Sequence, residues 1–199
     1  SSMIQNRPTF DGRAAGLTAL RERLIKLKLT QNSLDDRWLP ERGVRQETQL
    51  EFGSENGSVG DRALVKFHFS GEHYRSWNQS WVWKTRLLAD GIFTETVSDY
   101  QRLRSGGIQT IRGYPEQLFS ADRQFIISVE GQPVINPSLR GVLFIDAGWL
   151  APRVSPGPFS WGVGFIQNSK SAMIKFYYGI GRDISLSDGQ IHFQIINKF

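Results

Sequence analysis

One arginine and two carboxylates have residue types and sequence contexts that suit an ionic contact inside a protein. Arg112 lies in a glycine-rich stretch, Gly106–Pro115, of sequence GGIQTIRGYP. Glu130 and Asp146 each take a polar position where polar and apolar residues alternate, so both carboxylates point to the polar face. A loop folded onto that face could bring the planar guanidinium to both carboxylates. Such a bidentate contact is strong and directional away from water.

The glycines around Arg112 suit a loop that turns sharply. Gly106, Gly107 and Gly113 can adopt backbone conformations that side chains forbid. They belong to a long segment, residues 94–122, which interrupts the alternation of the flanking sequence. Connections of this length are usually functional or disordered. We therefore expect residues 94–122 to carry part of the function.

No group of residues predicts catalysis or metal binding. Cysteine is absent, which excludes disulfides, thiol nucleophiles, zinc–cysteine sites and iron–sulfur clusters. His68 and His73 are the closest pair of histidines, but they straddle a predicted strand end without a nearby acid to complete a site. Residues 56–60 lack the first glycine of a serine-hydrolase elbow and predict a hairpin turn. Phosphate-loop and dinucleotide motifs are also absent, so we expect neither an enzyme nor a cofactor.

Alternation with a period of two residues recurs from Ile25 onward and predicts β-strands. Turn residues separate about nine such segments, which indicates an antiparallel meander. Two of them are long for a soluble sheet and suit a tilted strand that crosses a membrane. Residues Ala14–Leu24 are the only candidate helix and are as easily the entrance to a strand. The segments centre on residues 25–29, 44–52, 63–69, 81–89, 124–130, 143–149, 161–165, 174–180 and 191–195.

The composition excludes several classes of protein. Hydrophobic residues make up 39% of the 199 residues, and no apolar run exceeds about six residues, whereas a membrane-spanning helix needs about 20. The net charge of +5 comes from lysines and arginines interleaved with acids, so no nucleic-acid partner is predicted. A membrane β-barrel stays compatible with these numbers, because its strands carry apolar residues only at alternate positions.

Two features favour a barrel in lipid over a soluble fold. The apolar positions carry large aromatic and β-branched residues, while the opposite positions mix charges with glycine, as expected for lipid outside and a wet lumen inside. Trp77, Trp81, Trp149 and Trp161 fall near predicted strand ends, where an aromatic girdle forms at a membrane surface. A soluble all-β ligand-binding module has the same periodicity and is the alternative.

The residues that suit an ionic contact also carry a resemblance to a known family. Residues 106–115 resemble the (V/I)RG(Y/F) loop motif of the BamA and TpsB superfamily, which are outer-membrane barrels that insert or secrete proteins. Residues 144–148, of sequence FIDAG, resemble the FxDxG strand motif of that superfamily. The matching positions are Arg112, Gly113 and Tyr114 of the loop and Glu130, Asp146 and Gly148 of the strands.

Further matches extend the resemblance along most of the chain. Pro40–Gly43 is similar to the P-x-R-G turn of the family, and Trp161–Gly164 resembles its glycine-rich strand. Phe199 is the terminal aromatic residue typical of outer-membrane barrels. The resemblance covers about Leu24–Phe199, and the order and spacing of its motifs make it fairly specific.

The resemblance implies a fold, a place and an activity. The fold is an antiparallel transmembrane β-barrel of the outer-membrane type, formed by residues 19–199, with a lumen loop at about 94–122 and an irregular segment or tag remnant at 1–18. The loop would be latched in the lumen by Arg112 to Asp146, with Glu130 as a second acceptor. The implied partners are a lipid bilayer and a client protein that is moved into or across the outer membrane of a bacterium, or of an organelle of bacterial origin.

The strand count leaves several architectures open. The barrels of the family have about sixteen strands, and outer-membrane chains normally have an even number. The chain is therefore the C-terminal part of a larger barrel with upstream strands, or it has another strand within Asn6–Leu20. A third option is a short barrel that stands alone or pairs with a second copy as a homo-oligomer, and serves as a pore or scaffold. An enzyme fused upstream, such as a lipase domain secreted through its own barrel, is compatible with each.

Overall fold

The computed structural model describes residues 21–57, 60–152, 154 and 156–198. Within these residues nine strands form one antiparallel sheet in chain order, and two more form a small ribbon, β5–β6. The predicted nine-stranded all-β meander is confirmed. The strands are β1 (Arg21–Asn32), β2 (Gly43–Gly57), β3 (Gly60–Asn78), β4 (Trp81–Phe93), β5 (Leu103–Ser105), β6 (Phe119–Ala121), β7 (Arg123–Asn136), β8 (Leu139–Ala151), β9 (Phe159–Asn168), β10 (Ala172–Gly181) and β11 (Gln190–Asn197).

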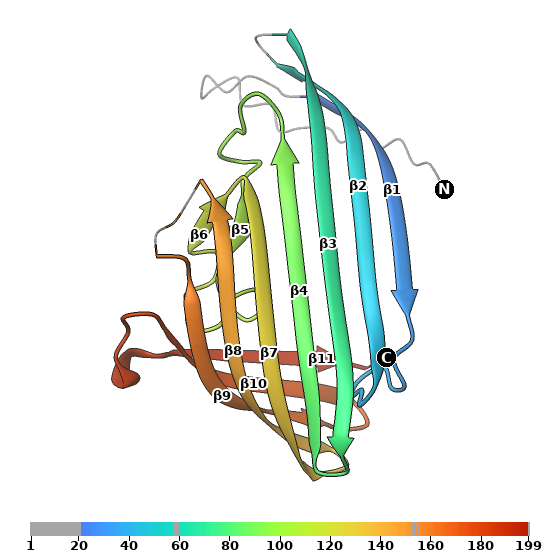
Figure 1. Ribbon diagram of the computed structural model, residues 1–199, viewed down its shortest axis with the longest axis vertical. Coiled ribbons are helices and arrows are strands. Elements are labelled where there is room, and N and C mark those ends of the chain that lie inside the picture. Colours follow the sequence, from blue (N-terminus) through green and yellow to red (C-terminus); the bar gives the residue numbers. More distant parts are fainter. Residues whose placement is uncertain (1–20, 58–59, 153, 155, 199) are drawn as a thin grey trace.

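The large sheet is a tall curved wall with two ends (Figure 1). Strands β1–β4, β7 and β8 stand side by side, whereas β9, β10 and β11 turn away and cross behind them. We call the end with the β1–β2, β3–β4, β7–β8 and β9–β10 turns the hairpin end, and the opposite end, from which residues 94–122 emerge, the loop end. The sheet stays open over the described residues, and its edge strands are β1 and β11. It therefore has the form of a partial barrel wall.

The two faces of the sheet differ as the alternation predicts. On β8, the side chains of Leu143 and Ile145 are 50% and 52% exposed on the outer face, while Asp146 is fully buried on the inner face. The inner face carries charges that pair across neighbouring strands, such as Lys84 and Glu72 with 3.0 Å between Nζ and Oε1. The outer face is therefore apolar, whereas the inner face combines paired charges with buried apolar side chains such as Val142 and Phe144.

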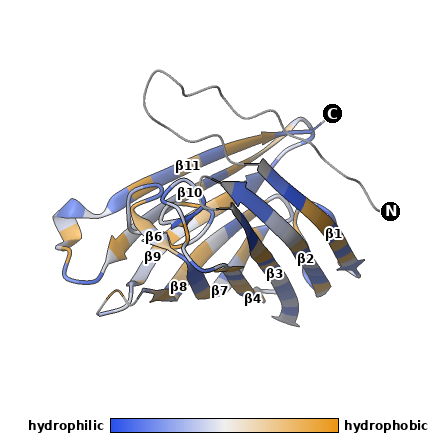
Figure 2. Ribbon diagram, turned by 90° about the horizontal axis from the view of Figure 1, so that it is seen from above, coloured by the Kyte–Doolittle hydropathy of each residue, from blue (hydrophilic) through white to orange (hydrophobic). Residues whose placement is uncertain are grey.

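Residues 94–122 lie inside the curve of the sheet (Figure 2). They contain β5 and β6, which pair from Leu103 with Ala121 to Ser105 with Phe119. The alternation does not predict these strands, because a strand of three residues is too short to establish a period. Pairing of β5 with β6 brings the two ends of residues 106–118 together, so that the glycine-rich stretch between the strands is held as a compact loop.

The tryptophans predicted for the membrane surfaces lie at different heights of the outer face. Trp77 and Trp81 lie at the hairpin end, and Trp149 lies near the loop end of β8. Trp161 is the third residue of β9 but pairs with Ile145 at the middle of β8, because β9 is shorter than its neighbour. A position near a strand end therefore does not always place a side chain at the rim of the sheet.

Some predicted features lie outside the described residues. These are the segment 1–18, the extra strand within Asn6–Leu20, residues 58 and 59 of the β2–β3 turn, and the terminal Phe199. Of the candidate helix or strand entrance Ala14–Leu24, only residues 21–24 are described, and they belong to β1. Among the described residues, no helix is long and apolar enough to cross a membrane.

Candidate functional site

Arg112 is bound at the centre of the inner face by side chains of two neighbouring strands. Its guanidinium donates from Nε and Nη2 to the two oxygens of Asp146 on β8, at 2.9 and 2.7 Å. It also donates from Nη1 to Glu130 Oε1 and from Nη2 to Ser128 Oγ on β7, at 2.7 and 2.8 Å. The backbone N–H of Arg112 adds a bond of 2.9 Å to Asp146. One residue of the loop is thus fixed to the wall by five hydrogen bonds.

Two aromatic rings cover the remaining faces of the guanidinium. Its central carbon lies 3.7 Å from the ring centroid of Phe144 and 4.9 Å from that of Tyr177. The Arg112 side chain is only 3% exposed. Burial by itself lowers the pKa of Arg112, but the Glu130 and Asp146 carboxylates outweigh it and raise the pKa above its ordinary value. The guanidinium therefore stays charged, and its charge is balanced by buried acids.

Gly113 lets the loop tip approach the last strands of the sheet. Its φ of +81° lies in the left-handed region, which side chains other than glycine rarely adopt. A Cβ added at Gly113 would lie 2.9 Å from backbone atoms of Ile180 and Gly181 on β10. Its N–H donates to Nε2 of His192 on β11 at 3.0 Å. The residue beside Arg112 therefore ties the loop to β10 and β11.

Tyr114 clamps two strand ends with its hydroxyl group. The hydroxyl donates to the carbonyl of Phe159, where β9 begins, and accepts from the N–H of Arg182, next to the end of β10, both at 2.9 Å. The ring meets Phe119 edge to face, with 5.0 Å between the centroids. The motif residues Arg112, Gly113 and Tyr114 thus bind different strands from one short stretch.

Gly148 makes room for the residue that precedes Arg112. A Cβ at Gly148 would lie 2.8 Å from Cδ1 of Ile111 and 3.0 Å from Cγ of Pro158. Ile111 is fully buried and packs with Tyr114 and Ile126 in an apolar cluster. The glycine two residues after Asp146 therefore serves loop packing rather than the ionic contact.

Gly106 and Gly107 form the turn that returns the loop towards Arg112. Both have positive φ, +111° and +91°. The N–H of Gly106 donates to Thr110 Oγ1 at 2.7 Å, and that of Gly107 donates to the Ile111 carbonyl at 3.0 Å. Glu116 closes the turn by accepting from the N–H of Ile108 at 2.8 Å. These bonds are local, so the loop holds much of its shape independently of the wall.

Residues of the inner face that the sequence did not single out also hold the loop. Arg86 on β4 donates from its guanidinium to the carbonyls of Gln109 and Thr110, the latter at 2.6 Å. Ser128 and His192 contribute the contacts given above. All three occupy inward positions of alternating strands, which is the only sign of them in the sequence.

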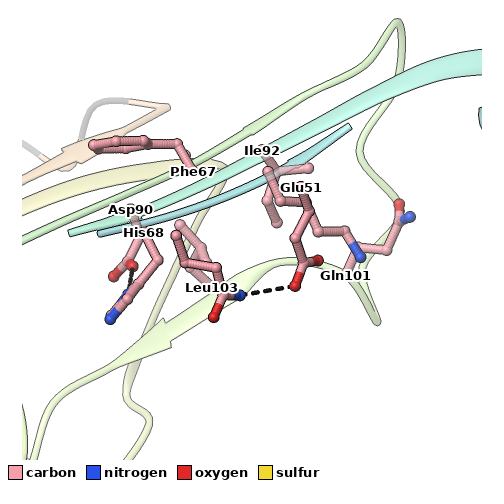
Figure 3. Close-up of a pocket in the computed structure, with 10 residues that line it drawn as sticks. Glu51, Phe67, His68, Asp90, Ile92, Gln101 and Leu103 are labelled. Carbon is pink, nitrogen blue, oxygen red and sulfur yellow. Dashed lines mark hydrogen bonds and ion pairs between the residues drawn. The ribbon is translucent and has the colours of Figure 1, made fainter. Parts of the chain in front are cut away.

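The first part of the long segment is bound to β1 and β2. Nε2 of Gln101 donates to Glu22 Oε1 at 3.0 Å and to Glu55 Oε2 at 2.6 Å. Figure 3 shows Gln101 and Leu103 beside Glu51 at a pocket of about 280 Å³ on the inner face. The segment is therefore attached at both sides of the curved wall.

The two histidines considered as metal ligands lie on opposite faces. His68 points to the inner face, where its Nδ1 contacts Asp90 Oδ1 at 2.5 Å (Figure 3), so an acid does lie beside it. His73, five residues along the same strand, is exposed on the outer face. Among the described residues, no group of three or more histidines and acids could hold a metal ion.

A second inward arginine holds the turn between β1 and β2. Arg140 on β8 is 3% exposed and donates to the carbonyls of Leu39 and Pro40 at 2.9 and 2.7 Å. Asp36 shapes this turn, because its Oδ1 accepts from the N–H groups of Trp38 and Leu39 at 2.7 and 2.6 Å. The P-x-R-G turn is thereby drawn inward at the hairpin end.

The turn reaches the same aromatic rings as the loop. The Leu39 side chain packs in an apolar cluster with residues of β8, β9 and β10, and this cluster contains Phe144 and Tyr177. Those two rings meet edge to face with centroids 5.9 Å apart. Arg112 covers them from the loop end and Leu39 packs against their cluster from the hairpin end.

Comparison with known proteins decides the family. A family model described as the Omp85 superfamily domain matches residues 14–199. The chain belongs to the Omp85 superfamily. No curated protein matches it.

Solved structures show the same fold as this Omp85 chain. BamA from Haemophilus ducreyi, in a crystal structure lacking POTRA domains 1–3, is similar with a TM-score of 0.70 and 15% identity over 88% of this chain. CdiB from Acinetobacter baumannii is similar with a TM-score of 0.65 and 16% identity over 88% of this chain. The matches cover 42% of the BamA chain and 33% of the CdiB chain, so this chain spans less than half the length of either.

Replacement of Arg112 tests how much the buried contact stabilises this Omp85 chain. Arg112→Ala leaves Glu130 and Asp146 buried without their cation, so we expect a loss of about 3–5 kcal/mol in the free energy of unfolding. Arg112→Lys keeps the charge but not the planar fork and should lose less. Urea unfolding of detergent-folded protein, followed by tryptophan fluorescence, measures both. Arg104→Ala, at an exposed position of the same segment, is the control, and a change at Arg112 within about 0.5 kcal/mol of that control contradicts the expectation.

Gly148 is tested by filling the space that Ile111 uses. Gly148→Ala should cost about 1–3 kcal/mol, because its Cβ overlaps Ile111. The same substitution in an Ile111→Ala background should cost less, since the overlapping methyl group is gone. Equal costs in the two backgrounds would show that Ile111 does not occupy this space.

Arg140 is tested by the accessibility of the β1–β2 turn. Arg140→Gln removes the charged hydrogen bonds to Leu39 and Pro40, each worth about 1.5–3 kcal/mol, so trypsin should cleave faster at the exposed Arg37 and Arg42. Arg45→Gln removes a half-exposed partner of Glu72, which keeps its ion pair with Lys84, and should leave the rate of cleavage at Arg37 and Arg42 nearly unchanged. Equal cleavage rates in both variants would mean that Arg140 does not hold the turn.

Proposed function

We propose that residues 19–199 form part of the wall of an outer-membrane β-barrel that moves proteins into or across that membrane. Membership of the Omp85 superfamily and the fold shared with BamA and CdiB support this function. The observation that carries it is the attachment of Arg112 to Asp146 and Glu130, because it places a loop across the inner face where a lumen would be. The activity is non-covalent and requires no cofactor.

The distribution of polarity supports placement in a lipid bilayer. Outer-membrane barrels present an apolar band to lipid and a polar interior, with short turns on the periplasmic side and longer loops outside. Here the β3–β4, β7–β8 and β9–β10 turns at the hairpin end are short, and residues 94–122 emerge at the other end. We therefore place the hairpin end in the periplasm of a bacterium and the loop end outside the cell.

The number of strands supports a larger barrel with further strands over a barrel that is closed by two copies of this chain. In a sheet of nine antiparallel strands, the edge strands β1 and β11 run in the same direction. Two copies related by an axis along the membrane normal would place β11 of one beside β1 of the other in parallel. Antiparallel closure instead needs an odd number of further strands, from residues outside the described ones or from another chain. Upstream strands of the same barrel meet this requirement, and a homo-oligomeric pore or scaffold is the second candidate.

The proposed mechanism depends on release of the loop. While Arg112 is bound, residues 94–122 fill the inner face and a client has no open path. Loosening of this latch, or of a seam beside β11, would admit a client segment. The client would be recognised by strand addition at a sheet edge, which requires only free backbone N–H and C=O groups and alternating side chains.

Deletion of the gene, with complementation, tests the transport function. Outer-membrane and secreted proteins are quantified in the deletion strain and after expression of the wild-type chain, Arg112→Gln or Arg112→Lys. We expect specific outer-membrane or secreted proteins to fall on deletion and to recover with the wild type. Arg112→Gln should not restore them, and Arg112→Lys should restore them in part, because it keeps the charge alone.

Controls separate transport from folding. Arg104→Gln makes the same charge change at an exposed position of the same segment and should restore the proteins fully. Heat-modifiable migration on a gel reports whether each variant is folded in the membrane. Unchanged protein levels in the deletion strain contradict the transport function. A chain that is monomeric and stable in plain buffer would instead favour the soluble ligand-binding module.

A further inference from the structure

The outer face has a large apolar hollow that the loop and the latch do not use. It measures about 740 Å³ and extends over strands β3 to β9 near the hairpin end. Trp77, Trp83 and Trp161 stand around it and are 79%, 43% and 46% exposed. Leu143 and Val163 form part of its wall. An exposed apolar hollow of this size is uncommon on a face that has only solvent to contact.

Gly131 forms the floor of the hollow. It occupies an outward position of β7, where the neighbouring outward residue, Val129, carries a side chain. A Cβ at Gly131 would lie 3.2 Å from Cζ3 of Trp81 and 3.6 Å from Cη2 of Trp83. The rings of these two tryptophans are stacked, with 6.4 Å between centroids. The missing side chain therefore lets these two rings lie close to the sheet, where they form an aromatic wall facing the aliphatic residues of β8 and β9.

A charged residue stands at one end of the hollow. An adjoining depression of about 540 Å³ shares Trp77 and Trp83 with it and is lined also by His73 and Arg75. Both His73 and Arg75 are exposed on the outer face, and no described carboxylate lies within ion-pair distance of Arg75. The guanidinium is thus available to an external anion.

The register of the sheet joins these residues into one row. Arg75 pairs with Trp83, Trp83 with Gly131, Gly131 with Leu143, and Leu143 with Val163. Neighbouring strands lie about 4.8 Å apart, so the row extends for about 19 Å across the wall. It begins with a cation and continues over an aromatic ring, a glycine and two aliphatic side chains.

The row also descends into the apolar part of the wall. Arg75 and Trp83 lie three and two residues from the hairpin-end termini of β3 and β4. Gly131, Leu143 and Val163 lie five, four and five residues from the corresponding termini of β7, β8 and β9. A charge is tolerated on the lipid face near a membrane surface but is costly at mid-depth, which agrees with Arg75 at the shallow end.

We propose that this row binds one phospholipid, with its phosphate on Arg75 and an acyl chain in the hollow over Gly131. The planar guanidinium matches a phosphate group in a bidentate arrangement. Trp77 and Trp81, at the hairpin end of β3 and β4, lie at the level where tryptophan rings sit beside the headgroup region. The inference rests on the proposed placement of the chain in a membrane. It assigns a fixed lipid to one site of the wall, distinct from the mobile lipids around it.

Native mass spectrometry of the full chain folded in neutral detergent tests the site. The added probes are dipalmitoylphosphatidylglycerol and dipalmitoylglycerol, which has the same acyl chains without the phosphate. We expect one phosphatidylglycerol to be retained per chain and dipalmitoylglycerol to be lost. Arg75→Gln should weaken retention about tenfold, since it removes the charged contact.

Variants of the hollow and a matched control complete the test. Gly131→Leu adds a side chain at the floor of the hollow, whereas Trp83→Ala removes part of its aromatic wall without adding volume. Both substitutions should lower retention of the lipid. Arg123→Gln makes the same charge change at an exposed residue near the loop end and should retain the lipid as the wild type does. Heat-modifiable migration confirms that each variant is folded before it is compared.

The outcomes separate the lipid site from the proposed membrane function. Equal retention of the two probes, or equal retention by Arg75→Gln and Arg123→Gln, overturns the site and means that only general lipid contact occurs. Loss on Arg75→Gln and on either folded hollow variant, with retention by Arg123→Gln, supports it. A wild-type chain that folds without detergent contradicts the proposed membrane placement itself, whereas a chain that folds in detergent and retains no lipid contradicts the site alone.

Discussion

The burial of one guanidinium between two carboxylates is the constraint on which the inner face depends. Arg112, Glu130 and Asp146 are each almost fully buried, and a charge removed from water in this way is tolerated only when its partners are placed around it. The position of the loop tip is therefore set by the hydrogen bonds from Arg112 to Glu130 and Asp146. Gly113 and Gly148 are glycines because that position leaves no space for a side chain. The other motif residues hold the loop tip around this ionic contact, Tyr114 through strand ends and Gly148 through packing with Ile111.

Much of this arrangement could be predicted from the sequence, and the remainder could not for a physical reason. Alternation assigns each residue to a face, so it places Glu130 and Asp146 inward and predicts the nine strands. Alternation does not say which inward residue meets which part of a loop, because that depends on strand register and on the path of the loop. Arg86 and His192 were therefore missed, although both have the inward position that their contacts require. Arg140 was missed because its inward position does not reveal its partners, which are the backbone carbonyls of Leu39 and Pro40 and the Glu41 side chain.

The inner face is closed by two segments that meet at one aromatic pair. Phe144 and Tyr177 are covered by the guanidinium of Arg112 from the loop end and belong to the cluster that holds Leu39 at the hairpin end. The loop is anchored by its own buried Arg112, and the β1–β2 turn is anchored by the buried Arg140 of β8. Because the two segments share the rings, displacement of one exposes apolar surface against which the other packs. The loop and the β1–β2 turn therefore both depend on the position of this aromatic pair.

The loop tip also connects the wall to the edge of the sheet. Arg112 is bound to β7 and β8, while the adjacent Gly113 contacts the backbone of β10 and donates to His192 on the edge strand β11. The planar peptide unit that joins them contains the Gly113 N–H, so displacement of the backbone at Arg112 also moves this donor. A shift of the loop tip away from β8 would therefore weaken the hydrogen bond to His192 on β11. An edge strand is the part of a sheet with the fewest partners, so the loss of one contact matters more there than in the interior of the wall. The geometry thus ties the position of the loop tip to the edge strand β11.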